Sequence, residues 1–305
     1  MEGVAHHEPA LWTAASWGDP LEVLLLLKGG ADIEEKGGVD ECSPLYEAVN
    51  RGNINAARVL LDNNAYASTK DKTGATPLHV LFSYARDAFE GQGHIEVPQR
   101  LLAISRSRHM VLHRLLIDHG ADVRARNNNG TTPLHLAADW HPRLVEFLLE
   151  LGADPFAKDA AGKTPIHCAR HKQVVQILLD QGADINVKDV AGETPLHDVI
   201  SANAFRGQGD VVKRMLKNGA VVTQGCLASA EARLGVVDET NINHKEISSI
   251  YKQNAKLLRA ALRRAEETHC VKCVAFAMGQ HKRLGEGSIV MNLSPDLLKM
   301  IVDRV

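Results

Sequence analysis

Short apolar runs separated by polar loops recur along the first two thirds of the chain. One run begins with "TTPLHLAA", in which Thr132 suits a helix cap, Pro133 fits the first turn and Leu134 starts the apolar face. A second run, "LVEFLLELG", is long enough for another helix, and Gly152 stands where a left-handed residue ends a helix. The loop "ADPFAKDAAGK" then carries an Asp-x-x-Gly turn. The pattern predicts a helix, a turn, a second helix and a turn-bearing loop.

This unit recurs, so a repeat architecture is the first hypothesis. Four copies of the opening tetrapeptide and two degenerate ones start at Thr76, Thr132, Thr164, Thr194, Ser43 and Pro9. A Gly-Ala-Asp signal, or a weaker form of it, follows each helical pair, at Gly30, Asn64, Gly120, Gly152, Gly182 and Gly219. We expect an N-terminal tail, 1–8, a helical C-terminal cap or extension, 227–305, and six repeats between them: 9–42, 43–75, 76–131, 132–163, 164–193 and 194–226.

The tetrapeptides, the paired leucines of the second run and the Gly-Ala-Asp turns resemble those of the ankyrin repeat family. The resemblance covers about residues 9 to 226. It implies an all-α ankyrin-repeat solenoid that is not an enzyme and that binds another protein through its concave surface. It also implies that threonine–histidine pairs hold the stack together: Thr76 and His79, Thr132 and His135, Thr164 and His167, Thr194 and His197. Because stacked copies lie a repeat apart, we do not expect these histidines to share a metal ion.

The loops keep a constant length, whereas the helical halves vary. The alanine of the Gly-Ala pair and the next threonine are 11 residues apart in four cases, and only Ala31 to Ser43 differs, at 12. An insertion at about 83–108 enlarges the third repeat, and the sixth repeat carries a shorter echo of it. Insertions on one side of a solenoid contact a partner in some proteins and reflect neutral drift in others. Both interpretations stay open for this chain.

In ankyrin proteins the loop tips and the exposed ends of the first helices form the concave surface. Eight residues after the start of each tetrapeptide lie Trp17, Arg51, Tyr84, Trp140, Lys172 and Ala202. Trp, Tyr and Arg are the residue types most enriched in binding hot spots, so the first four are candidate partner contacts. The alternative is that the tryptophans pack over the ends of their own helices. The loop tips add Lys72, Asn128 and Asn129 as candidates.

Asn186 occupies a loop position at which some ankyrin proteins accept asparagine hydroxylation. The equivalent residues of three other repeats are Glu34, Arg124 and Phe156, which cannot be modified in that way. Asn186 is therefore a possible modification site, and an ordinary loop asparagine is the favoured interpretation.

Composition adds few constraints. A net charge of -2 with 24% charged residues gives no general reason to expect nucleic acid or a membrane surface as a partner. Five irregularly spaced cysteines argue for a reducing compartment, and neither a secretion signal nor a membrane-spanning run is apparent. We therefore expect a cytoplasmic or nuclear protein, with no indication of an oligomer.

Two groups of residues offer candidate chemistry, but neither is complete. His109 and His113 have the spacing of a metal-binding pair, yet Met110 stands where a zinc protease needs glutamate, which favours a surface pair. His269, Cys270, Cys273 and His281 lack the second paired set typical of a structural zinc site. No phosphate loop or nucleophile motif is present. We expect no catalysis, metal or cofactor.

The C-terminal segment is basic. Residues 244–283 hold nine Lys plus Arg and three Asp plus Glu, and Lys252, Lys256, Arg259 and Arg263 follow helical spacing. A solvated cap over the end of the solenoid is favoured over a binding site for acidic polymers or lipids. The tail "NLSPDLLKMIVDRV" resembles the start of an F-box or a SOCS-box region. A substrate-recognition subunit of a ubiquitin ligase is therefore the main alternative function.

Overall fold

The computed structural model describes residues 8–81, 111–140, 142–202, 208–235, 249 and 252–264, without the side chains of residues 140 and 233–235. Several predicted features lie outside these residues: the whole insertion at 83–108 with Tyr84, His109, the group from His269 to His281, and the tail helix after Ser294. Within the described residues every regular element is helical, apart from an isolated bridge between Gly37 and Cys42. The predicted all-α class is confirmed.

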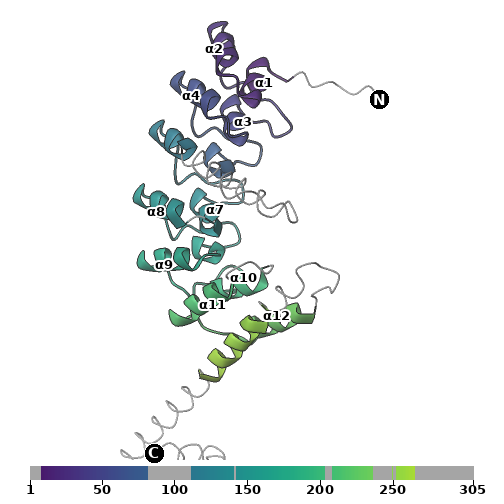
Figure 1. The fold of residues 1–305 in the computed structure, drawn as a ribbon, viewed down its shortest axis with the longest axis vertical. Helices are drawn as coiled ribbons and strands as arrows, with labels where there is room; N and C mark the ends of the chain where they lie inside the picture. The colour runs from purple at the N-terminus through teal and green to yellow at the C-terminus, as the bar shows by residue number, and fades with distance from the viewer. Residues whose placement is uncertain are drawn as a thin grey trace, which may run out of the picture.

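The helices form two columns along an elongated stack (Figure 1). The first helix of each repeat packs on the first helix of the next, and the second helices pack in the same way. The first helices are α1 (Ala10–Trp17), α3 (Pro44–Asn50), residues 77–81, α7 (Pro133–Trp140), the 3-10 helix η1 (Pro165–Cys168) and α10 (Pro195–Ser201). The second helices are α2 (Pro20–Lys28), α4 (Ile54–Asp62), residues 111–118, α8 (Pro142–Glu150), α9 (Lys172–Asp180) and α11 (Gln208–Lys217).

Short polar signals begin and end these helices. The Ser43 hydroxyl accepts a hydrogen bond from the backbone N–H of Tyr46 at 3.2 Å, and Pro44 follows at the first helical position. After each second helix the chain turns at a residue with positive φ, for example Gly152 at 85° and Gly182 at 86°. Asn64 takes that role in repeat 2 with a φ of 68°. The predicted unit of two helices and a loop follows from these local preferences.

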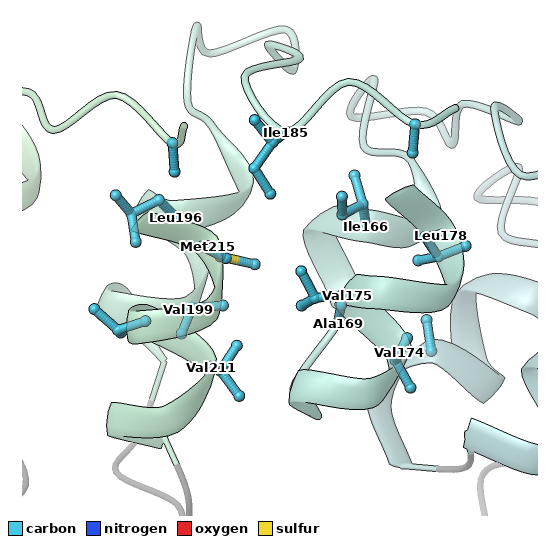
Figure 2. Close-up of a cluster of buried hydrophobic side chains, with 14 of the residues drawn as sticks. Ile166, Ala169, Val174, Val175, Leu178, Ile185, Leu196, Val199, Val211 and Met215 are labelled. Carbon is cyan, nitrogen blue, oxygen red and sulfur yellow. The ribbon is translucent and has the colours of Figure 1, made fainter. Parts of the chain in front are cut away.

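The core consists of small and branched side chains buried between neighbouring helical pairs. Leu148 and Leu178 are completely buried. Figure 2 shows side chains of η1 and α9, such as Val175, facing those of α10 and α11, such as Val199. The buried residues form two clusters, one running from Leu11 to Ala121 and the other from Leu134 to Leu258, and Val123 packs against both. Because each helical pair covers the apolar flank of the next, the repeats stabilise one another.

Repeat 5 departs from the predicted pattern. Its first helix is the single 3-10 turn η1, and Ala169 is already extended, with φ -69° and ψ 110°. The physical reason is length, because Thr164 and Gly182 are 18 residues apart, against 20 for Thr132 and Gly152. Lys172 consequently begins α9 instead of following the end of a first helix. Its predicted equivalence to Trp17 and Arg51 is wrong.

The stack also continues beyond the predicted end of repeat 6. Residue 226 lies inside α12 (Gln224–Gly235), which packs on α10. The Thr223 hydroxyl accepts a hydrogen bond from the Cys226 backbone N–H at 3.2 Å, as a capping residue does. Residues 252–264 are helical, and their Leu258 is completely buried in the same core as α11. The predicted end of repeat 6 at residue 226 therefore falls within a helix that packs on α10, and helical packing continues past the last recognisable repeat motif.

Candidate binding surface and the links between repeats

The fourth residue of the tetrapeptide joins one repeat to the next. The Nδ1 atom of His135 lies 3.2 Å from the backbone nitrogen of Thr132 and 2.8 Å from its hydroxyl. On the other side of the ring, Nε2 lies 3.0 Å from the carbonyl oxygen of Lys163, in the loop that leads into the next repeat. A carbonyl oxygen only accepts, so Nε2 carries the proton and Nδ1 is the acceptor. His79 makes the same contacts with Thr76 and with the Thr131 carbonyl.

The other two histidines differ from this pattern. His167 has its Nδ1 atom 3.0 Å from both the nitrogen and the hydroxyl of Thr164, within its own repeat. His197 instead places Nε2 3.0 Å from the Ser229 hydroxyl on α12 and Nδ1 3.1 Å from the Glu193 carboxylate. The last tetrapeptide therefore links the solenoid to the C-terminal segment and not to another copy of the loop.

Aromatic residues take the place of histidine in the first two repeats. The indole N–H of Trp12 points at the sulfur of Cys42, 3.4 Å away. The Tyr46 hydroxyl donates to Asp71 at 3.0 Å. Both contacts reach the loop before the next repeat, as the contacts of His79 and His135 do. Trp12, Tyr46, His79 and His135 therefore share a polar atom at the far end of the ring, and this atom makes the contact with the loop.

Burial disfavours the protonated form of three tetrapeptide histidines. Desolvation lowers the pKa of His79, His135 and His167 below the ordinary histidine value. No group of three or more His, Cys, Asp or Glu in the described residues could hold a metal ion. His113 is only 1% exposed, so the prediction of a surface pair with His109 is wrong for this member. It lies in the core because its helix is the second helix of repeat 3.

The described thiols are poor nucleophiles. Burial raises the pKa of Cys42 to about 11 and that of Cys168 to about 12. Thiols with such pKa values stay protonated at neutral pH, whereas nucleophilic catalysis needs the thiolate. Cys42 and Cys226 are buried and, like Cys168, are not in a disulfide. These cysteines therefore act as core residues.

The hairpin tips form a continuous hydrogen-bonded row. The Asp71 carboxylate accepts from the backbone N–H groups of Thr73, at 2.9 Å, and Ala75, at 2.8 Å, which closes the turn. Each tip then donates a backbone N–H to the tip before it. The pairs are Lys72 to Asp40, Asn128 to Thr73, Ala160 to Asn129 and Val190 to Ala161, at 2.8 to 3.0 Å. This row holds the tips in register and accounts for the common loop length of the later repeats, while the repeat 1 loop, one residue longer, still joins it through Asp40.

Two of the predicted tip contacts serve this row. The Lys72 ammonium donates to the Val39 carbonyl at 2.8 Å and lies 3.0 Å from the Asp40 carboxylate. The side-chain amide of Asn128 donates to the Lys72 carbonyl at 3.1 Å. The side chain of Asn129 is exposed. Of the three tip candidates, Asn129 is the one for which the structure shows no side-chain contact within the described residues.

The predicted helix-end residues occupy different situations. Trp17 ends α1 with 82% of its surface exposed, although Ala14 and Ala15 of the same helix are buried. Arg51 follows α3, and its Nε atom lies 2.7 Å from the Glu47 carboxylate. Trp140 ends α7, and its side chain lies outside the described part of the chain, as does Tyr84 altogether.

Ion pairs between first helices were missed by the repeat alignment. Arg170, just after η1, lies 2.7 Å from Asp139 of the preceding repeat, and Lys163, in the loop at the end of repeat 4, lies 2.5 Å from Asp198 of repeat 6. The Ser16 hydroxyl of repeat 1 donates to the Glu47 carboxylate at 3.2 Å. The only sequence signal was a scatter of charges along the first helices at non-equivalent positions. These contacts tie neighbouring first helices together at the surface.

A further row joins the loops that follow the second helices. Glu34 accepts from the Tyr66 backbone N–H at 2.7 Å, and Ser68 accepts from the Asp122 N–H at 2.8 Å. Arg124 donates to the Gly152 carbonyl at 2.6 Å. Asn186 makes two such bonds, to the Gly219 carbonyl at 3.0 Å and from the Val221 N–H at 2.8 Å. Residues of unlike chemistry therefore perform one structural task at this position.

A family model described as ankyrin repeats (3 copies) matches residues 11–91, 98–159 and 141–225, more than half of the chain. The chain belongs to the ankyrin repeat family. Ankyrin repeats are protein–protein interaction modules, and the family is generally non-enzymatic. In the described residues no helix is long and apolar enough to span a membrane.

Several ankyrin relatives align with parts of the chain. The human ankyrin repeat and SOCS box protein 11 is 32% identical over 108 residues, 32% of each protein. The transient receptor potential cation channel subfamily A member 1 homolog of Caenorhabditis elegans is 31% identical over 116 residues, 37% of this chain and 9% of the channel. A putative ankyrin repeat protein of Rickettsia bellii is 37% identical over 62 residues, 20% of this chain and 25% of the relative. The chain thus spans at most about a third of these relatives.

Proposed function

We propose that this ankyrin protein binds a partner protein through the hairpin tips and the exposed ends of its first helices. The observation that carries the proposal is Trp17, which is 82% exposed at the end of an otherwise packed helix. An indole ring in water offers a large apolar area that a partner can bury at little cost in side-chain entropy. The rigid row of tips supplies a surface that is organised before binding.

Within that surface we assign different roles to the candidates. Trp17, Trp140 and Asn129 would contact the partner, and Arg51 would add a guanidinium group held beside α3 by Glu47. Lys72 and Asn128 would act indirectly, because their side chains hold neighbouring tips together. Tyr84 stays a candidate on its sequence position alone.

The test begins with affinity purification of the full chain from cell extract, followed by mass spectrometry and affinity measurement with the partner identified. Trp17→Ala and Trp140→Ala should each weaken binding by more than about 1 kcal/mol, or roughly fivefold, while the unfolding transition stays in place. Glu146→Ala, at an exposed residue of α8 on the opposite column of helices, is the control and should leave the affinity unchanged. Unchanged binding by both tryptophan variants would contradict the proposal.

The similarity to an ankyrin repeat and SOCS box protein favours a second candidate, a substrate-recognition subunit of a ubiquitin ligase. The repeats would hold the client and the segment after residue 264 would hold the scaffold. A truncation at residue 226 would cut α12, so the informative truncation ends at residue 264. Cullin-type scaffold subunits should copurify with the full chain and not with the shorter one. Equal recovery with both chains would exclude this candidate.

Binding of acidic polymers or lipids through residues 244–283 has weaker support. In the described part of that segment, Lys252, Lys256 and Arg263 are exposed, but Arg259 already pairs with Glu231 at 2.7 Å. Ala255 and Leu258 of its apolar face are buried in the core, which leaves less apolar surface for insertion into a bilayer. Binding to heparin or RNA that falls steeply with added salt would favour this candidate, and binding that is absent at low salt would exclude it.

Two smaller assignments follow from the same contacts. We propose that Asn186 is a structural residue, because both atoms of its amide already bond to the loop of the next repeat. Intact-mass analysis of the protein isolated from cells tests this, since hydroxylation adds one oxygen to the peptide that contains Asn186. We also propose a reducing compartment, the cytoplasm or nucleus, because the described cysteines are free thiols.

A further inference from the structure

The outer face of α2, the second helix of repeat 1, is apolar and open to solvent. Leu21 is 71% exposed and Leu25 69% exposed, and Leu24 between them is partly exposed. Residues spaced by three and four positions share one side of a helix, so these leucines form a single stripe, which we call the leucine face. It lies at the N-terminal end of the stack (Figure 1).

The other repeats show what this fold normally places there. The Gly-Ala turn aligns α2 with the later second helices, and the residues equivalent to Leu24 are polar or charged in every one: Arg58, Arg114, Glu146, Gln176 and Lys213. The residues equivalent to Leu21 are polar in all but one: Asn55, Val111, Arg143, Gln173 and Asp210. Stacking therefore does not require leucine at these two positions. Their presence in repeat 1 points to a surface that something covers.

A missing neighbouring repeat does not account for Leu21 and Leu24, although four of the five residues equivalent to Leu25 are apolar (Val59, Leu115, Phe147 and Ile177) and pack against the core. One residue of each later second helix packs against the preceding repeat and is at most 5% exposed: Ala56, Leu112, Leu144, Val174 and Val211. The equivalent residue of repeat 1 is Glu22, which is exposed. An added repeat would bury this carboxylate without a partner, which is costly. The charged Glu22 therefore lies where a preceding repeat would stack, and the leucine face lies on the side of the stack.

We propose that the leucine face pairs with the leucine face of a second copy of this chain, with the two α2 helices antiparallel about a two-fold axis near Leu25. In that arrangement Leu25 meets its own symmetry mate, and Glu22 of each copy lies opposite Lys28 of the other. Both charged residues are exposed, and neither has an ion pair among the described residues of its own chain. A surface that is complementary to itself is what a two-fold interface requires.

The pair is weak and depends on concentration. A nine-residue helix presents a small interface, and exposed ion pairs add little affinity while they fix the register. We expect a dissociation constant of roughly 1 to 100 µM, in the range of small transient interfaces. The inference does not depend on the partner surface proposed above, because Trp17 and the hairpin tips contribute nothing to it.

Sedimentation velocity of the full chain over about two decades of concentration around that range tests the proposal. The wild-type chain should pass from monomer to dimer. The double variant Leu21→Asn, Leu24→Arg should raise the dissociation constant at least about tenfold, because it buries polar groups in the interface. It copies Asn55 and Arg58 from the same positions of repeat 2, so the fold is compatible with it. A wild-type chain that stays monomeric, or a dimer that this variant leaves intact, would overturn the proposal.

A charge exchange tests the antiparallel register. Glu22→Lys and Lys28→Glu alone each place like charges opposite one another across the two-fold axis and should each weaken the dimer severalfold. The double variant Glu22→Lys, Lys28→Glu restores opposite charges and should recover the wild-type dissociation constant. Circular dichroism and urea unfolding confirm that every variant is folded. Failure of the double variant to recover dimerisation would overturn the antiparallel pairing.

Discussion

Repeat 1 and the interior repeats share one scaffold but differ in what they show to solvent. In both regions the fourth residue of the tetrapeptide contacts the loop that leads into the next repeat, through Trp12 in one case and His135 in the other. The second helix of repeat 1 exposes leucines, whereas the later second helices expose charges. Its hairpin is also one residue longer, with Glu41 at a φ of 49° and Val39 88% exposed.

The comparison of repeat 1 with the interior repeats distinguishes positions that pack against a neighbouring repeat from positions on the outer surface. A residue between two repeats must satisfy the groups on both sides, so it varies only among side chains that deliver the same contact. A residue on the outer surface has no such constraint, and the features particular to this protein collect there. Substitutions in the interior should therefore change stability, whereas those on the surface of repeat 1 should change association.

The largest expected effect comes from a leucine in the interior core. Leu148→Ala removes a completely buried side chain from α8 and leaves a cavity, so the free energy of unfolding should fall by about 2 to 5 kcal/mol. Leu25→Ala is the matched control in repeat 1 and should change it by no more than about 0.5 kcal/mol, because Leu25 is 69% exposed. Urea unfolding followed by circular dichroism measures both. Equal losses would remove the distinction between the two regions.

The fold could be predicted because the same sequence signals for each helix and loop recur in several repeats. Proline at the first helical position, a positive-φ residue after each second helix and the leucine pairs are local signals, and agreement between copies makes them specific. The short η1 and the start of α12 before residue 226 could not be predicted in the same way. Both depend on packing against a neighbour, which holds a degenerate segment in place even though its motif is lost.

The candidate site was less predictable than the fold. The alignment identified Trp17 by position, but it could not show that Lys72 and Asn128 are occupied by contacts between the tips. It also misplaced Lys172, because a shortened repeat breaks the register. Links made by unlike residues, such as Glu34 and Arg124, leave no common sequence signal. Their shared role appears only when neighbouring loops are seen together.

The next effect in size concerns the linking histidine of the interior. His135→Ala leaves the buried backbone N–H of Thr132 without its acceptor and removes one donor to the Lys163 carbonyl, which keeps its hydrogen bond from the Asp159 N–H. We expect a loss of about 1 to 3 kcal/mol in the free energy of unfolding. His171→Ala, at an exposed residue only a repeat away, should have no comparable effect. If both variants lose the same amount, the link between repeats contributes nothing.

Stability should also fall with acid pH, because the linking histidines lie in the interior. Burial lowers the pKa of His79, His135 and His167 in the folded chain, so the unfolded chain binds more protons as pH drops below about 6.5. Their contribution is complete above that value and is lost as pH falls toward the folded pKa values. Urea unfolding at a series of pH values measures the slope. His135→Tyr, which copies Tyr46 of repeat 2, should make the slope shallower, and an unchanged slope would contradict this origin.

The smallest effect is expected where a repeat 1 side chain holds the next loop at the surface. Glu34→Ala removes one exposed hydrogen bond to the Tyr66 N–H and should lower the free energy of unfolding by no more than about 1 kcal/mol. Glu34→Gln keeps an acceptor oxygen and should lose less. Asn186→Ala removes two bonds from the same position of repeat 5 and should cost about twice as much as Glu34→Ala. A larger loss at Glu34 than at Asn186 would mean that repeat 1 is held as firmly as the interior, and the comparison between the two regions would have to be abandoned.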